Sequence, residues 1–123
     1  MQAHRLRHVL PGLLALVLAA GAPRSAAAHA ILVEARPAAK STVAGPDVAF
    51  RLRFNSRIDG ARSRLSLVRP DKSTGALALD RQETPQVLAA RARGLAPGAY
   101  RLRWQVLAAD GHVTRGEIPF RVK

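Results

Sequence analysis

The sequence has no cysteine and little methionine or aromatic content, and each shortage excludes a class of structure. Without cysteine, the chain of 123 residues forms no disulfide and offers no thiolate to a metal ion. Its one methionine is Met1, so a site built from several thioether sulfurs is excluded. The sequence contains no glycine-rich phosphate loop and no serine in a nucleophile-elbow context, which argues against the enzyme classes built on those motifs.

Residues 1–28 have the three parts of a secretory signal peptide. Arg5 and Arg7 supply the positive start, residues 9–22 supply an apolar stretch, and the small residues of "SAAA" precede a cleavage point after Ala28. An uncleaved membrane anchor is the alternative, but the apolar stretch is too short for a comfortable membrane span. We therefore expect cleavage, export to the periplasm of a Gram-negative host, and a mature domain of residues 29–123.

Basic residues outnumber acidic ones, with 20 lysines and arginines against 8 aspartates and glutamates. Loss of residues 1–28 would leave 17 basic residues and a net charge of about +9. The arginines are dispersed, and in "RLRF" and "RLRW" they occupy alternate positions, as on the solvated face of a strand. We expect no nucleic-acid binding and only weak attraction to anionic surfaces.

Short segments of alternating apolar and polar residues, separated by turn signals, predict an all-β fold. In residues 48–54, for example, Phe50 and Phe54 share one face of the expected strand while Arg51 and Arg53 share the other. About seven such strands in under a hundred residues predict an immunoglobulin-like β-sandwich. The expected strands cover residues 30–35, 48–54, 63–70, 76–81, 86–92, 99–107 and 116–122.

Several local features refine this prediction. Residues 37–47 are rich in turn-forming residues and are expected to form a loop. The weaker patterns of residues 76–81 and 86–92 indicate edge strands, and Pro119 indicates an edge position or a bulge in the last strand. Trp104 falls at an inward position and is expected to pack in the core.

Only two histidines follow the predicted cleavage point, His29 and His112. Cleavage would make His29 the N-terminal residue, and its α-amine and imidazole are groups that ordinarily titrate at about 7.7–8.0 and about 6.5. Both nitrogens can bind a metal ion and close one chelate ring. Asp110 and His112 are two positions apart, so in extended backbone their side chains leave the same face.

Together these groups offer three nitrogens and one carboxylate oxygen. Such a tetragonal set suits Cu(II), which also has the highest affinity among the common divalent ions, although zinc could use the same donors in a tetrahedral arrangement. Asp110-Gly111 is also a strong signal for a two-residue hairpin turn between strands. Taken alone, "DGH" therefore indicates a turn more often than a pair of ligands.

These residues resemble the CopC family of periplasmic copper-resistance proteins. The resemblance rests on "HAILVEARPAAKSTV" directly after the signal, on "VAFRLRFNSRID", and on "LAPGAYRLRWQVLAADGHVTRGEIPFRV". It implies a Greek-key β-sandwich that binds one Cu(II) through His29, Asp110 and His112. It also implies delivery of copper to, or cooperation with, an inner-membrane transporter of the CopD type.

Two departures from the family pattern bear on the expected site. Some members have a glutamate near copper at the position where this chain has Ser56, which offers no carboxylate as a fourth side-chain ligand. Members with a separate Cu(I) site carry a methionine-rich loop, whereas residues 29–123 contain no methionine. A version that binds only Cu(II) is therefore expected.

The functional expectation is an exported, monomeric Cu(II) carrier or buffer in copper homeostasis and resistance, not an enzyme. One alternative is a copper-dependent oxidase or oxygenase that uses the same two histidines as a brace. Another is a cationic module that binds anionic envelope polymers without a metal, in which case its binding would depend on salt and ignore chelators.

Overall fold

The computed structural model describes residues 29–123, and the predicted signal peptide lies outside the described residues. Within this part of the chain, no helix is long and apolar enough to cross a membrane. The described residues form eight strands and one short 3-10 turn, Gly60–Arg62. The strands are β1 (Leu32–Arg36), β2 (Ser41–Val43), β3 (Val48–Phe54), β4 (Arg64–Val68), β5 (Thr74–Leu77), β6 (Val87–Ala92), β7 (Gly98–Leu107) and β8 (Val113–Val122).

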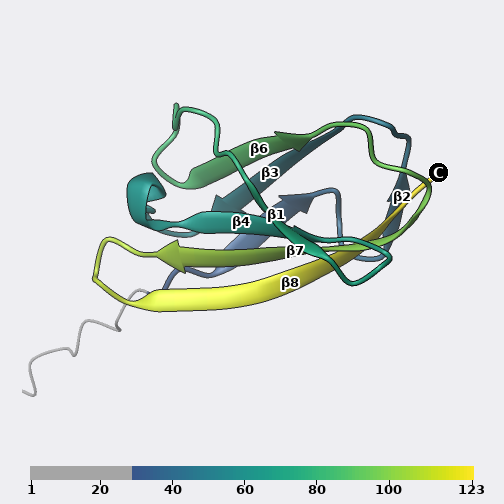
Figure 1. The fold of residues 1–123 in the computed structure, drawn as a ribbon. Coiled ribbons are helices and arrows are strands. Elements are labelled where there is room, and N and C mark those ends of the chain that lie inside the picture. The colour runs from purple at the N-terminus through teal and green to yellow at the C-terminus, as the bar shows by residue number, and fades with distance from the viewer. Residues whose placement is uncertain (1–28) are drawn as a thin grey trace, which may run out of the picture.

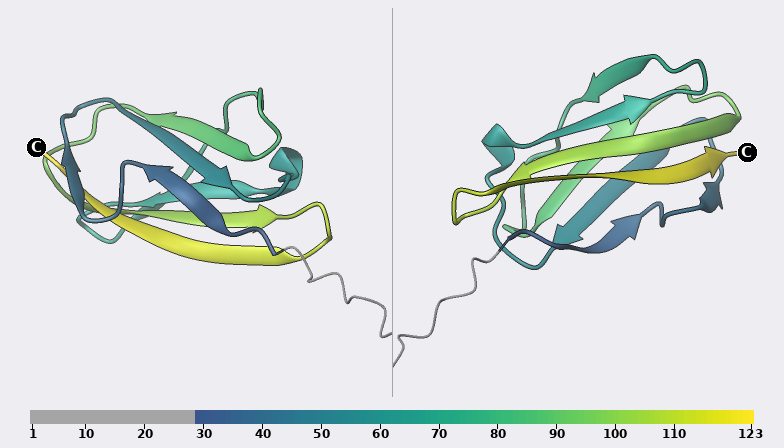
Figure 2. Two further views of the ribbon diagram at one scale, coloured as in Figure 1. Left: turned by 180° about the vertical axis from the view of Figure 1, so that it is seen from behind. Right: turned by 90° about the horizontal axis from the view of Figure 1, so that it is seen from below.

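The strands form two sheets that pack face to face (Figures 1 and 2). One sheet has three strands in the order β1-β3-β6, and the other has five in the order β2-β8-β7-β4-β5. All neighbours are antiparallel except β2 and β8, which run parallel. The predicted immunoglobulin-like Greek-key sandwich is confirmed, with eight strands in place of about seven.

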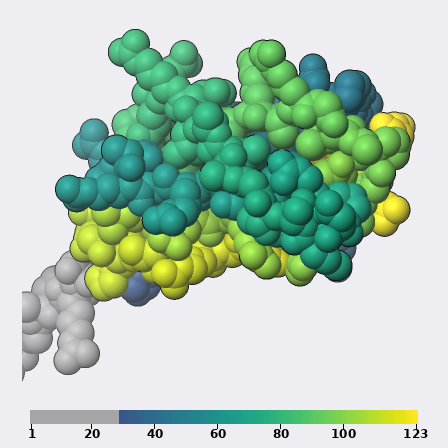
Figure 3. Space-filling view, in the orientation of Figure 1, coloured from purple at the N-terminus to yellow at the C-terminus, as the bar shows by residue number. Residues whose placement is uncertain are grey.

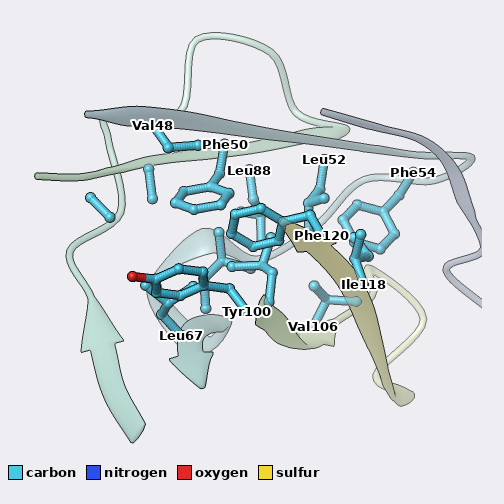
Figure 4. Close-up of a cluster of buried hydrophobic side chains, with 14 of the residues drawn as sticks. Val48, Phe50, Leu52, Phe54, Leu67, Leu88, Tyr100, Val106, Ile118 and Phe120 are labelled. Atoms are coloured by element: carbon cyan, nitrogen blue, oxygen red, sulfur yellow. The ribbon is translucent and has the colours of Figure 1, made fainter. Parts of the chain in front are cut away.

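The core lies between the sheets and follows the alternation of the sequence (Figure 4). In β3, Phe50 and Phe54 point inward and are almost fully buried, and from the opposite sheet Phe120 meets Phe50 edge to face with ring centroids 5.5 Å apart. Tyr100 stacks on the other side of Phe120 and donates its hydroxyl hydrogen to the Ala96 carbonyl at 2.7 Å. The ring therefore packs in the core while its polar end is satisfied.

The prediction that residues 37–47 form a loop throughout was wrong, because Ser41–Val43 forms strand β2 and pairs with the end of β8. Backbone hydrogen bonds to a neighbouring strand decide this assignment, and the three residues carry no two-period pattern of their own. The expected edge strands are confirmed, since β5 and β6 lie at sheet edges. Pro119 pairs with Arg101 of β7 in unbroken register, whereas β2 pairs only with the three residues after it, so β8 is at an edge on that side at Pro119 and has no bulge there. The Pro119 carbonyl accepts the Lys40 N–H at 2.7 Å.

Trp104 packs inward from β7, as predicted, and meets Phe54 of the opposite sheet with ring centroids 5.3 Å apart. It is half-buried, because it lies toward the open end of the sandwich. Its indole lies over Gly116, its cross-strand partner on β8. A Cβ atom at Gly116 would lie 2.8 Å from the indole Nε1 and closer still to two ring carbons. Glycine is required here for the space that the indole occupies.

We predict that Gly116→Ala destabilises the domain by about 1–3 kcal/mol, since the added methyl forces the buried side of the indole to shift. Urea unfolding followed by circular dichroism measures the change. Gly75→Ala is the matched control, because its Cβ would meet only the mobile guanidinium of Arg69. Equal stability of the two variants would contradict this account of Gly116.

Candidate metal centre

The β7–β8 hairpin ends in a tight loop that carries Asp110 and His112. The Ala108 N–H donates to the His112 carbonyl at 2.9 Å, and the Gly111 N–H donates to the Ala108 carbonyl at 2.9 Å. Gly111 has φ of 85°, the left-handed conformation that glycine adopts without steric cost. The loop is therefore a three-residue turn with glycine at its last position, and the two-residue turn expected from Asp110-Gly111 is wrong by one residue.

This loop turns the Asp110 carboxylate back onto His112. The backbone N–H of His112 donates to Asp110 Oδ1 at 3.0 Å, and Nδ1 of the same histidine lies 3.0 Å from Oδ2. The hydrogen bond from the His112 backbone, above all, lowers the pKa of Asp110 below its usual range, and the His112 side chain and the nearby His29 add to this effect. The carboxylate is therefore ionised at neutral pH, where a metal ion would need it.

His29 reaches the same place because the first residues of the domain are tied to both sheets. Asn55 accepts the Ile31 N–H on its Oδ1 at 2.8 Å and donates its own backbone N–H to the Ile31 carbonyl at 3.0 Å. From β8, the hydroxyl of Thr114 donates to the Ala30 carbonyl at 3.1 Å. Ala30 itself is buried. These contacts fix the chain on the residue directly after His29.

The three predicted residues therefore converge at one end of the sandwich, where the described chain begins beside the β7–β8 hairpin (Figure 1). One ligand atom each from His29, Asp110 and His112 lies within 4.8 Å of the other two. The two imidazole rings meet edge to face with centroids 4.8 Å apart. Nitrogen and oxygen ligands at about 2.0–2.2 Å from one ion lie up to about 4 Å apart. Small side-chain rotations are enough to close these three residues around a single ion.

The cluster is open to solvent. All three residues are exposed, and even the better covered carboxylate of Asp110 keeps 24% of its side-chain surface in water. None of five cavities found over the described residues is lined by any of them. The arrangement can hold a small cation at an accessible tip.

Ser56 lies next to the hairpin but outside the three-residue cluster. The Ala109 N–H donates to the Arg57 carbonyl at 3.0 Å, and Ile58 forms a bridge with Ala108, so this segment runs beside the loop. The Ser56 hydroxyl oxygen is buried and has no hydrogen-bond partner among the described residues. Among the described residues, the cluster has no second carboxylate or third imidazole.

The sequence analysis missed the residues that position the site. Asn55 and Thr114 were not singled out, because a lone Asn after a strand and a lone Thr in a strand are common in any β protein. Their role depends on contacts with residues far away in the sequence. Three large hydrophobic residues of the described chain are exposed, namely Ile31, Val33 and Val113, and the sequence pattern did not indicate this. Each lies within four residues of His29 or His112.

We predict that Asn55→Ala loosens the segment that carries His29. Loss of one hydrogen bond worth about 0.5–1.5 kcal/mol should speed hydrogen exchange of the Ile31 amide about 2- to 10-fold. Exchange measured by NMR on the domain tests this, with Ser73→Ala as control because the Ser73 hydroxyl donates to Asp71 in a distant turn. Unchanged protection of the Ile31 amide in Asn55→Ala would show that Asn55 does not anchor the segment.

Comparison with known proteins places residues 32–123 in one family. The family profile described as the CopC domain matches residues 32–123. Protein YobA of Escherichia coli K12 is 31% identical over 99 residues, covering 78% of this chain and 80% of the relative. Copper resistance protein C of Xanthomonas campestris pv. juglandis is 29% identical over 115 residues, covering 88% and 91%.

Solved structures agree with the sequence matches. The crystal structure of CopC from Methylosinus trichosporium OB3b superposes with a TM-score of 0.70 at 32% identity, covering 77% of this chain and 94% of that one. PcoC of Escherichia coli, described as a methionine-rich copper resistance protein, superposes with a TM-score of 0.63 at 26% identity, covering 78% and 100%. By contrast, this sequence has a single methionine. The profile match and the relatives above 30% identity show that this protein is a member of the CopC family.

Proposed function

We propose that this protein is an exported Cu(II) carrier or buffer that holds one ion at the end of the sandwich. The ligands are the α-amine and imidazole of His29, the imidazole of His112 and the carboxylate of Asp110. The observation that carries the proposal is the convergence of these three side chains, distant in sequence, within 4.8 Å of one another. Membership in a family whose named relatives include copper resistance proteins supports copper as the cargo.

The donor chemistry favours copper over other divalent ions. Imidazole and amine nitrogens with one carboxylate oxygen match the tetragonal N,O environment of Cu(II), which also leads the affinity order. Zinc can use the same atoms only with a tetrahedral arrangement. With no cysteine and no methionine in residues 29–123, the domain offers no soft sulfur ligand for Cu(I).

Asp110 contributes a negative charge whether it binds the ion or holds the His112 ring. Its Oδ2 lies 3.0 Å from Nδ1 of His112, a contact that can orient the ring and leave Nε2 open to a metal. Its lowered pKa keeps the carboxylate charged. The same carboxylate offsets part of the charge of a divalent ion arriving at a basic protein.

Exposure of the cluster supports a carrier instead of an enzyme. A copper ion at the hairpin tip stays accessible to the ligands of a donor or acceptor, and the exposed side chains of Ile31, Val33 and Val113 offer a small apolar surface beside it. We propose export to the periplasm through residues 1–28 and transfer to an inner-membrane transporter of the CopD type. The family resemblance supports that acceptor.

We predict that His112→Ala, or one alanine added before His29 in the mature chain, weakens Cu(II) binding by about 100-fold or more. The first change removes an imidazole, and the second converts the α-amine into an amide that no longer binds as an amine. Loss of supporting groups alone typically costs about 10–100-fold in metal affinity. Competitive titration against a chelator of known affinity measures the effect.

Glu34→Gln is the matched control, because Glu34 is an exposed carboxylate paired with arginines away from the hairpin. Native affinity in either altered protein would overturn the proposed site. Oxygen consumption by the copper-loaded protein with a reductant distinguishes the carrier from an oxidase. We expect no more consumption by the copper-loaded protein than by the metal-free protein with the same reductant.

A further prediction concerns pH. Because the pKa of Asp110 is lowered below its usual range, its carboxylate stays ionised between pH 5 and 7. Asp110→Asn should therefore weaken Cu(II) binding by the same factor at every pH in this range. Titrations at a series of pH values test this. A shallower profile for Asp110→Asn would show that the carboxylate does titrate there.

The same lowered pKa affects the stability of the metal-free fold. The pKa of the Asp110 carboxyl is lower in the folded chain than in the unfolded chain, so its ionised form stabilises the fold at pH values above the unfolded pKa. This stabilisation disappears as the pH falls through the lowered pKa of the folded chain. The expected loss of stability therefore lies below the pH range of 5 to 7 used for the copper titrations.

A further inference from the structure

A concave surface lies at the other end of the sandwich from the metal centre. It has a volume of about 370 Å³ and is floored by apolar atoms of Val68, Ala99 and Pro119, on β4, β7 and β8. Figure 3 shows the side of the molecule on which β4 and β5, in teal, are seen above β7 and β8, in yellow-green and yellow, as parts of one sheet. Around the floor are side chains from four separate segments, and those that carry charge are Lys40, Arg69, Lys72, Arg101 and Arg121.

All charged residues that line this surface, which we call the cationic pocket, are basic. Another cavity of the described chain, lined by Arg51, Arg81 and Arg91, also includes Asp80 and Glu83, so its charge is mixed. Acidic residues near the cationic pocket are already engaged. The Asp71 carboxylate accepts the backbone N–H and the hydroxyl of Ser73 at 2.9 and 2.6 Å.

Not every cation of the pocket is free to bind an anion. The Arg101 guanidinium pairs with Glu117 at 3.2 Å, and the guanidinium of Arg69 lies over Gly75. Among the described residues, four cations of the pocket have no ion pair: Lys40, Arg69, Lys72 and Arg121. These four unpaired cations define the part of the pocket that can recognise an anion.

The backbone at the two lysines adds an independent observation. Lys40 has φ of 63° and Lys72 has φ of 71°, and no other non-glycine residue of the described chain has positive φ. The left-handed conformation costs a residue with a side chain roughly 1–2 kcal/mol, and glycine would adopt it freely. Both pocket positions therefore have a lysine where the backbone conformation favours glycine.

We propose that the cationic pocket binds a phosphate group, which goes beyond the copper function. Several ammonium and guanidinium donors around a shallow recess match the charge and the multiple acceptor oxygens of phosphate. The pocket is separate from the metal centre, because Pro119 and Val113 are six residues apart on β8, or about 20 Å at about 3.3 Å per residue. Phosphate and copper can therefore bind at the same time.

Phosphate of this kind comes either from a soluble polyphosphate or from the headgroup of an anionic lipid. The test uses residues 29–123 and two probes: tripolyphosphate by calorimetry, and vesicles of phosphatidylglycerol in phosphatidylcholine by sedimentation, both at about 0.1 M salt. The variant Lys40→Gln, Lys72→Gln, Arg121→Gln removes three of the four unpaired cations and leaves Arg69, whose guanidinium lies over Gly75. The control Arg51→Gln, Arg81→Gln, Arg91→Gln removes the same charge from the cavity of mixed charge.

We expect the pocket variant to bind at least one probe about 100-fold more weakly, since each basic residue near an anionic surface contributes about a factor of 5. The control should lose little, and both variants should keep native Cu(II) affinity and circular dichroism. Loss for tripolyphosphate identifies a soluble phosphate, and loss for vesicles alone identifies a lipid headgroup. Equal loss in the two variants, or no binding of either probe by the native domain, would overturn the proposal, whatever the copper result.

Discussion

The hydrogen bonds that tie residues 30 and 31 to both sheets are the constraint on which the metal centre depends. Asn55 holds Ile31 from the three-stranded side, and Thr114 holds Ala30 from β8. Without them His29 would be an unrestrained chain start, and its two nitrogens would meet Asp110 and His112 only at an entropic cost. The sandwich thus preorganises a site from residues at opposite ends of the domain's sequence.

The sequence predicts the alternating strands well, because burial on one face leaves a two-residue period that Phe50, Leu52 and Phe54 display directly. It does not predict β2, whose three residues are strand only through their pairing with β8. The proximity of His29, Asp110 and His112 was predicted, but the geometry behind one pair was not: Asp110 and His112 meet through a turn and a backbone hydrogen bond, not through extended backbone. Loop length depends on hydrogen bonds that a dipeptide signal does not specify.

The two ends of the sandwich differ in chemistry although the whole protein is basic. One end gathers two imidazoles, one ionised carboxylate and three exposed hydrophobic side chains. The other gathers lysine and arginine around an apolar floor. Between them, arginines on the outer face of β7 are neutralised in part by Glu117, which accepts from Arg101 and Arg103 at 3.2 and 2.6 Å. The hydrogen bond from Arg103 is the main cause of a lowered pKa of Glu117, and the charge of Arg101 adds to it. A high net charge therefore does not mean a uniform surface, and each end is suited to a different ligand.

The central claim is that His29 is the first residue of the working protein and binds copper through its amine and its ring. Electron paramagnetic resonance of residues 29–123 loaded with one Cu(II), with ¹⁵N in the histidines only, tests it most directly. The account predicts a tetragonal spectrum with hyperfine coupling to three labelled nitrogens, one amine and two imidazoles. A spectrum with oxygen donors alone, or with one coupled nitrogen, would contradict it.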